Sequence, residues 1–368
     1  MEKYINEVYP LLKELCKIPA PSHMEEKRAE FCKKYMIDAG FSKVYIDDAK
    51  NVVCESNCET SSEITVFAAH TDTVFPDLEP MPYVEKDGLA YCPGIGDDTV
   101  CVAVLMVVAK YLLKEGKMPP NGIVFLFNSC EEGLGNLKGI REFMKNYEGR
   151  VKNFITFDSQ LDKIVNKAVG SHRYKVTVET EGGHSFNAFG NENAIAHLAN
   201  IVKKIYEIEV PKNGDSKTTY NVGDIRGGTS VNTIAQKAEI LCEYRSDDVE
   251  CIGKMKEKFM KIFDEEKSEK VKVTVETVGE RPCACGVDEK AQSELTEKCK
   301  AIYEEITGKD VLIESGSTDC NIPMSQGVPS VAVGAYMGGG MHTREEWLEI
   351  DSIKDGFLAA VKVIGLFF

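Results

Sequence analysis

The sequence predicts an α/β protein with a central, mostly parallel sheet flanked by helices, into which a smaller βαββαβ domain is inserted. Short apolar segments alternate with helical segments along most of the chain, which is the pattern of a doubly wound sheet. In the middle of the chain, alternating polar and apolar residues replace the apolar segments. We therefore expect a main domain formed by residues 1–170 and 278–368, and an inserted domain at 171–277.

The central sheet is predicted from four short segments rich in β-branched and aromatic residues. Each is almost wholly apolar, as expected of strands that are covered on both faces. A first helix precedes them, and a pair of strands is expected within 44–56. The four segments are 64–69, 123–128, 153–158 and 329–336. The helices between and after them are expected at 97–115, 136–147 and 288–307.

The inserted domain is predicted from a change in periodicity. Segments such as RYKVTVET, at 173–180, alternate polar and apolar residues, which is typical of strands with one buried face. Helices are expected near 191–208 and 248–265. The resulting order of strand, helix, two strands, helix and strand is that of a small split βαβ domain.

Composition excludes several classes of partner. The formal net charge is −15 and no basic run compensates for it, so we expect no binding to nucleic acid or to an anionic membrane. No apolar run approaches the ~18 residues of a membrane span, and the N-terminus lacks a signal-peptide pattern. Thirteen cysteines in mostly apolar surroundings favour reduced thiols and a cytoplasmic location.

Metal-binding side chains occur where the predicted strands end. Because the carboxyl ends of parallel strands meet at one edge of a sheet, these side chains are expected to converge. The long gap between Asp158 and His342 is the one that an inserted domain would create. The side chains concerned are His70, Asp72, Asp97, Glu131, Glu132, Asp158 and His342.

Imidazole and carboxylate groups together suit zinc or a similar divalent ion, and a pair of ions needs a bridging carboxylate. Asp97 is the natural bridge. Glu131 and Glu132 are adjacent in a loop and can point in different directions, so one can bind metal while the other acts as general base. Asp72 can accept a hydrogen bond from the far ring nitrogen of His70 and orient that ring.

Each motif also has a structural explanation when it is taken alone. Asp97 with Asp98 could cap the helix that follows, and Glu131 with Glu132 could be solvated loop acids. The convergence of all the motifs on one edge of the sheet favours the metal site.

The motifs HTDTV, GIGDDTVCVAVLM, EEGLGN, DSQ and MHTREEW resemble those of the co-catalytic zinc peptidase family that contains peptidase T, aminoacylase and carboxypeptidase G. Their order and spacing match over the whole chain. The resemblance implies a cis peptide bond between Asp97 and Asp98, with Glu131 as the base and Asp72 as the orienting group. It also implies the ligands of two metal ions, which are His70, Asp97 and Asp158 for one and Asp97, Glu132 and His342 for the other.

Three segments of the inserted domain extend the resemblance: EGGHSF, GGTSVNTIA and CEYR. They imply that the domain is a lid or dimerisation domain, that His184 reaches a neighbouring active site across a dimer and stabilises the oxyanion, and that Asn232 and Arg245 hold a substrate carboxylate. Alternatively, His184 is an ordinary loop histidine, Asn232 caps a turn and Arg245 is a cation at a strand edge.

The hypothesis is therefore a cytoplasmic metallopeptidase that cleaves short peptides. Glu131 would take a proton from the attacking water and pass it to the leaving amine. The expected cofactors are two divalent ions per chain, zinc first, with cobalt or manganese as alternatives. The segment GSTDCNIPMSQGVPSVAVG favours the peptidase T branch, hence an aminopeptidase for di- and tripeptides. The alternatives are an N-acyl amino acid deacylase and a non-catalytic binding protein with the same fold.

Overall fold

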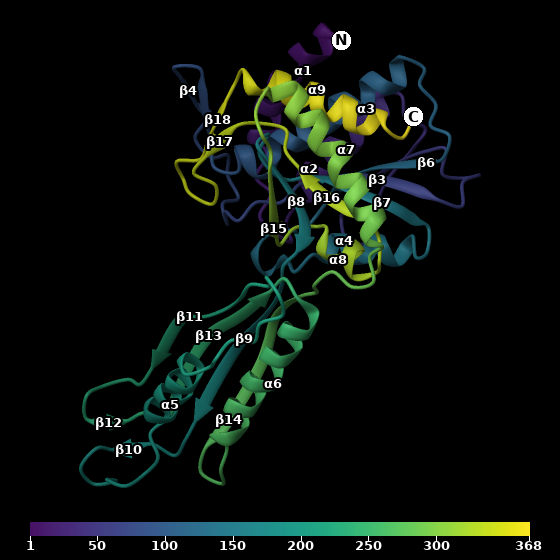
Figure 1. Ribbon diagram of the computed structural model, residues 1–368. Coiled ribbons are helices and arrows are strands. Elements are labelled where there is room, and N and C mark those ends of the chain that lie inside the picture. Colours follow the sequence, from purple (N-terminus) through teal and green to yellow (C-terminus); the bar gives the residue numbers. More distant parts are fainter. The chain divides into compact units, whose positions relative to one another are not determined.

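The computed structural model describes residues 1–368, which form two compact units (Figure 1). Unit 1 consists of Met1–Ala168 and Cys285–Phe368, and unit 2 of Val169–Ala284. Unit 2 extends past residue 277, where the inserted domain was expected to end, because strand β14 continues through a bulge to Arg281. None of the helices combines the length and the apolar character needed to cross a bilayer.

Unit 1 is built on an eight-stranded sheet in the order β1-β2-β6-β3-β7-β16-β8-β15. Strands β6, β3, β7 and β16 run parallel to one another at its centre, and they are the four strands predicted from apolar segments. The α/β class with a mostly parallel sheet is thus confirmed. The strands are β1 (Lys43–Ile46), β2 (Val52–Ser56), β3 (Ile64–His70), β6 (Gly122–Asn128), β7 (Val151–Phe157), β8 (Lys163–Ala168), β15 (Leu312–Gly316) and β16 (Ser330–Val333).

The two central strands β3 and β6 are buried at every residue. This explains why both are apolar throughout, since a strand covered on both faces has no side that tolerates polar residues. Strands β8 and β15 were not predicted. Their sequences, KIVNKA and LIESG, mix polar with apolar residues, and β15 at the edge of the sheet is largely exposed.

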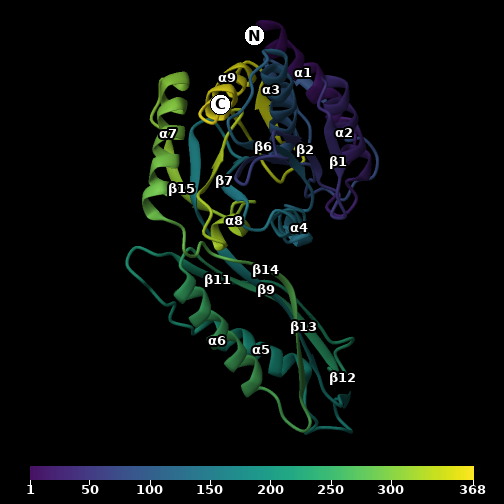
Figure 2. The ribbon, with the colours of Figure 1, turned by 90° about the vertical axis from the view of Figure 1, so that its right-hand side faces the viewer.

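The largest helical layer of unit 1 forms around α3, most of which is buried. Helix α3 contacts β3, β6 and β7, while α1 and α9 pack against α3 and α7 packs against α9 (Figure 2). Helices α4 and α8 contact each other. The helices of unit 1 are α1 (Glu2–Cys16), α2 (Glu26–Ala39), α3 (Cys101–Lys114), α4 (Lys138–Asn146), α7 (Glu289–Thr307), α8 (Asn321–Ser325) and α9 (Ser352–Gly365).

A small antiparallel sheet in the order β17-β18-β5-β4 completes unit 1. It ties the C-terminal part of the chain to residues 84–91, because β18 pairs with β5. Its strands are β4 (Val84–Lys86), β5 (Leu89–Tyr91), β17 (Gly338–Gly339) and β18 (Trp347–Glu349).

Unit 2 is an antiparallel sheet in the order β11-β13-β9-β14, with helices α5 and α6 packed on it. Side chains of the sheet and of both helices form one apolar core. Each helix starts at a capping side chain, Asn193 for α5 and Asp248 for α6, as capping preferences predict. The elements are β9 (Gly170–Glu179), β10 (Gly183–His184), α5 (Ala194–Tyr206), β11 (Thr218–Gly227), β12 (Thr233–Ile234), β13 (Lys237–Ser246), α6 (Val249–Glu265) and β14 (Lys272–Arg281).

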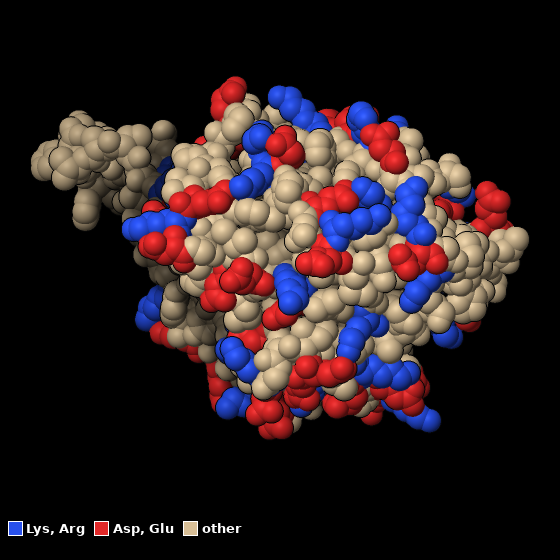
Figure 3. Space-filling model, turned by 90° about the horizontal axis from the view of Figure 1, so that it is seen from above, with Lys and Arg blue, Asp and Glu red and all other residues tan.

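On the molecular face shown in Figure 3, acidic and basic side chains are interspersed, and no continuous basic area is visible. All thirteen cysteines are free thiols, and all except Cys285 are buried.

Candidate active site

His70 is the last residue of β3 and is buried. Its backbone N–H donates to Asp98 Oδ2 at 3.0 Å. Its ring nitrogen Nε2 lies 3.0 Å from Asp97 Oδ1, and Nδ1 lies 3.0 Å from the backbone carbonyl oxygen of Asp72. The ring is therefore held on one side by the backbone and presents Nε2 to the carboxylate of Asp97.

Asp97 lies in a π-helical turn, Ile95–Val100, that leads into α3, and the backbone departs from helical geometry at Asp97 and Asp98. Two glycines make this turn possible. Gly94 has a φ of +74°, and a Cβ atom at Gly96 would lie 2.6 Å from the hydroxyl of Tyr336. The peptide bond between Asp97 and Asp98 is cis, as the family resemblance implied. Asp97 directs Oδ1 to His70 and Oδ2 to His342 Nε2, each at 3.0 Å, so its two oxygens face different imidazoles.

Glu131 and Glu132 occupy the loop after β6, and Asp72 organises this loop. The Asp72 carboxylate accepts hydrogen bonds from the backbone N–H groups of Glu131 at 2.9 Å and Glu132 at 3.0 Å, and from the Ser22 hydroxyl at 2.6 Å. Asp72 Oδ1 lies 3.5 Å from His70 Nδ1. The carboxylate of Asp72 was expected to orient the His70 ring. The closer partner of the ring is instead the backbone carbonyl oxygen of Asp72.

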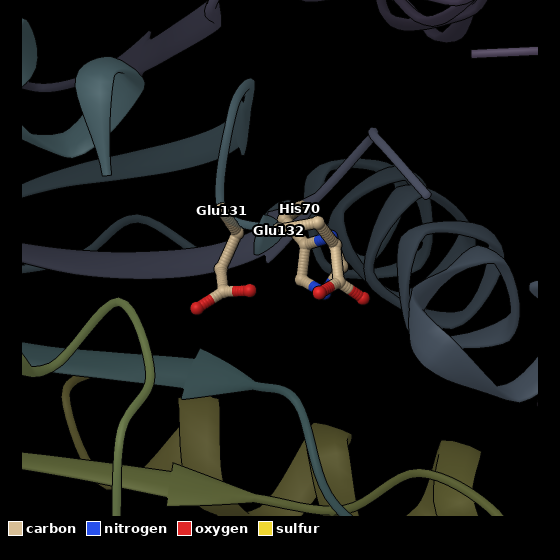
Figure 4. A group of neighbouring side chains, drawn as sticks. All are labelled: His70, Glu131 and Glu132. Carbon is tan, nitrogen blue, oxygen red and sulfur yellow. The ribbon is translucent and has the colours of Figure 1, made fainter. Parts of the chain in front are cut away.

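Glu131 and Glu132 leave this loop in different directions (Figure 4). Glu132 lies beside His70 in that view, whereas the Glu131 carboxylate extends to the other side. The expectation that the two adjacent acids point apart therefore agrees with the structure.

The remaining two ligand candidates come from the end of β7 and from the C-terminal part of unit 1. Asp158 follows β7, and its Oδ1 lies 4.0 Å from His70 Nε2. His342 has a φ of +63° and its side chain is 56% exposed. Its Nε2 lies 3.1 Å from Glu132 Oε1.

The structure thus brings together two groups of three ligand atoms that share Asp97. Within each group, all the ligand atoms lie within 4.8 Å of one another. His70, Glu131 and Glu132 form a third such group. Nitrogen and oxygen donors at this density fit a divalent ion of the zinc type. The two groups that share Asp97 are His70, Asp97 and Asp158, and Asp97, Glu132 and His342.

The charges of the site also fit a cation. Burial raises the pKa of Glu132 to about 7 and the pKa of Asp158 well above its ordinary value, and neighbouring carboxylates add to both shifts. Hydrogen bonds to Asp97 and Glu132 raise the pKa of His342 to about 10. Buried carboxylates that repel one another are stabilised in their charged forms by a divalent cation between them.

Two acidic residues that the motifs did not single out are buried in this region. Glu346 accepts three backbone N–H groups of the loop that carries Asp97. Asp319 accepts a hydrogen bond from Asn128 Nδ2 at 2.7 Å, and burial together with the charge of Glu131 raises its pKa to about 8. Both lie inside segments quoted above, MHTREEW and GSTDCNIPMSQGVPSVAVG, but neither was predicted as a site residue.

The three predicted residues of the inserted domain lie in unit 2. His184 and Asn232 occur together, because His184 in β10 pairs with Thr233 in β12 and the Ser185 N–H donates to the Asn232 carbonyl at 3.0 Å. His184 Nδ1 accepts from the backbone N–H of Phe186 at 3.3 Å. This bond places the proton of a neutral ring on Nε2, which leaves that atom as a donor.

Arg245 lies elsewhere in unit 2. It is near the end of β13, eight residues from Lys237, and at about 3.3 Å per residue that span is roughly 25 Å. The β10 and β12 pair lies beyond the Lys237 end of this strand (Figure 1). Arg245 donates two hydrogen bonds to Glu243, at 2.8 and 3.1 Å. Within one chain, the structure therefore does not bring Arg245 to Asn232.

An α/β sheet with histidine and carboxylate groups gathered at the carboxyl ends of its parallel strands fits the class of metal-dependent hydrolases. Comparison with known families specifies this class. The profile of Peptidase family M20/M25/M40 matches residues 66–365. The chain belongs to this family, and it is a metallopeptidase.

Individual relatives match nearly the whole chain or about half of it. The uncharacterized protein YqjE of Bacillus subtilis is 25% identical over 93% of this chain and 94% of its own length. A succinyl-diaminopimelate desuccinylase of Wigglesworthia glossinidia brevipalpis is 28% identical over 49% of this chain and 52% of its own.

Two solved structures share the fold over nearly their full length. A tripeptidase from Staphylococcus aureus has a TM-score of 0.80 at 23% identity, with 99% of this chain and 98% of that chain covered. Aminopeptidase PepT from Bacillus cereus has a TM-score of 0.74 at 22% identity, with 98% of each chain covered.

Proposed function

We propose that this chain is a two-metal aminopeptidase that hydrolyses di- and tripeptides. The observation that carries the proposal is the pair of ligand groups joined by Asp97, whose two oxygens face two separate imidazoles. A tripeptidase and an aminopeptidase among the structures with this fold support the choice of substrate.

His70, Asp97 and Asp158 would hold one divalent ion, and Asp97, Glu132 and His342 the other. Bound there, zinc, or cobalt or manganese in its place, would polarise the scissile carbonyl and lower the pKa of a water. Asp72 keeps the loop of Glu131 and Glu132 in place through its two backbone hydrogen bonds.

Glu131 is the proposed general base. Its side chain leaves the loop in a different direction from Glu132 (Figure 4), and the Glu131 carboxylate would take a proton from the attacking water. It would then pass that proton to the amide nitrogen as the C–N bond breaks, which releases the amine and the acid.

Unit 2 would complete the site in a dimer. His184 Nε2 is a donor suited to a developing oxyanion, and Asn232 and Arg245 are suited to a substrate carboxylate. Since Arg245 and Asn232 lie apart within unit 2, we propose that the two residues reach a given substrate carboxylate from different chains, with His184 and Asn232 contributed together. The outer strands β11 and β14 offer edges through which two chains could pair.

The alternative is an N-acyl amino acid deacylase, because the scissile bond is the same amide and one relative is a desuccinylase. The free thiols support a cytoplasmic location for either activity.

The test is hydrolysis of a panel of free-amine dipeptides, free-amine tripeptides, N-acetyl amino acids and N-succinyl amino acids, each with and without added zinc, cobalt or manganese. The proposal expects metal-dependent cleavage of the free-amine peptides and little cleavage of the acylated amino acids. The reverse preference would establish the deacylase, and no cleavage under any condition would contradict both.

A further inference from the structure

Glu346 is a buried acid with an unusual set of partners. Only 1% of its surface is exposed. Its Oε2 accepts the backbone N–H of Gly94 at 2.7 Å, and its Oε1 accepts those of Gly96 at 2.7 Å and Asp97 at 2.9 Å. Both oxygens of one carboxylate are therefore bound by a single loop, the one that carries Asp97.

These bonds act on the position of Asp97. Buried N–H groups require acceptors, and three of them that converge on one point form a nest that favours an anion. Because one of the three belongs to Asp97, the carboxylate of Glu346 fixes the backbone from which the Asp97 side chain extends.

Glu346 is itself held by regular structure. Its carbonyl oxygen accepts the Cys92 N–H at 3.1 Å, which extends the ladder in which Trp347 of β18 pairs with Tyr91 of β5. It also follows His342 by one short loop. The segment from His342 to Glu346 thus contacts Asp97 twice. His342 faces the side-chain oxygen Oδ2 of Asp97, and the Glu346 carboxylate accepts the backbone N–H of Asp97.

We propose that Glu346 is a positioning residue of the metal centre. It holds the loop of Asp97 so that Asp97 Oδ1 faces His70 and Asp97 Oδ2 faces His342. This inference rests on the two-ion centre of the proposed function. Glu346 would bind neither metal nor substrate, and its effect would be transmitted through the backbone of Gly94, Gly96 and Asp97.

The test uses the full-length chain, stripped of metal and titrated with Co²⁺ alone in a calorimeter. Wild type is expected to bind two ions per chain. In Glu346→Gln the side-chain oxygen can keep the bonds to Gly96 and Asp97, but the amide NH2 group faces the Gly94 N–H, so that two donors meet. We therefore expect about tenfold weaker binding of both ions in Glu346→Gln and about hundredfold weaker binding in Glu346→Ala. The control Glu345→Gln removes an exposed charge one residue away and should bind as wild type does.

A second measurement separates positioning from general stability. Two cobalt ions that share a carboxylate are magnetically coupled, so the electron paramagnetic resonance of cobalt-saturated Glu346→Gln should show weaker coupling than wild type. Melting of the metal-free proteins checks the fold, and if Glu346→Ala does not fold, the Gln variant decides. A folded Gln variant with wild-type affinity and coupling would overturn the inference. A wild-type chain that binds fewer than two ions would overturn the proposed function and the inference with it.

Discussion

Units 1 and 2 each contain a histidine between two carboxylates, but the charges around it are balanced differently. In unit 2, His197 lies 2.9 Å from both Glu266 and Glu192, and Lys204 also reaches Glu266 at 3.2 Å. In unit 1, His70 and His342 face a larger set of buried or partly buried acids, which includes Asp97, Asp158 and Glu132.

The difference indicates which cluster stabilises the fold and which needs a ligand. Positive side chains of the same chain compensate the acids near His197, so that cluster ties α5 to the end of α6. Two imidazoles do not compensate the acids near His70, and burial raises the pKa values of Glu132 and Asp158. A cluster of the second kind is where a divalent cation fits.

The largest effect is expected for the base in unit 1. Glu131→Gln should lose ~10²–10⁴-fold in kcat, because the amide cannot accept a proton from water, while its metal content stays at two ions per chain. Kinetics and elemental analysis on one preparation measure both. Glu148→Gln, an exposed acid beyond α4, is the control. Near-normal turnover in Glu131→Gln would show that another group is the base.

The next largest effect is expected on metal content, and it distinguishes Asp97, which both ligand groups share, from His342, which belongs to one group. Asp97→Ala removes a ligand from both groups and should lose both ions, whereas His342→Ala removes a ligand from one group and should retain one ion. Elemental analysis after dialysis of the two variants and the wild type measures this. Equal metal content in the two variants would contradict the bridging role of Asp97.

A third experiment brings the two units into one assay. A mixture of His184→Ala chains and Glu131→Gln chains should regain activity, because one site of each mixed dimer receives Glu131 from one chain and His184 from the other. With random pairing, the expected recovery is roughly a quarter of wild-type activity. A fully active monomer in sedimentation analysis, or no recovery in mixtures shown to exchange chains, would exclude this arrangement.

The smallest effect is expected in unit 2 and depends on pH. Burial opposes the charged ring of His197, but hydrogen bonds to Glu266 and Glu192 outweigh it and raise the pKa of His197. A raised folded-state pKa stabilises the protein fully below the unfolded value of about 6.5 and loses this effect as pH rises through the folded value.

His197→Gln should therefore lower Tm more at about pH 6 than at about pH 9, because the stabilisation by the charged ring is lost as pH rises. Thermal melts of the metal-free protein measure the difference. Lys203→Gln, an exposed neighbour on α5, should change Tm equally at both pH values. A His197→Gln effect that grows with pH would contradict the sign of the shift.

Much of the candidate site was predictable because it follows from strand order. His70 ends one parallel strand, and Asp158 and Glu132 follow two others, so the carboxyl edge of the sheet brings the three together. The clamp by Glu346 was not predictable, because its partners are backbone N–H groups and every residue except proline carries one. The ion pair of Arg245 with Glu243 was also missed, although two residues apart on a strand share one face.

By itself, the sequence determined the fold class and the candidate metal ligands, because apolar periodicity and residue chemistry are local properties. The tertiary structure decided how those side chains are held. In the folded chain, the Asp72 carboxylate binds backbone N–H groups of Glu131 and Glu132. Glu346 binds the backbone of the loop that carries Asp97, and Arg245 lies apart from Asn232. Each of these depends on where distant backbone groups meet after folding, and hydrogen bonds to the backbone leave no pattern in the order of residue types.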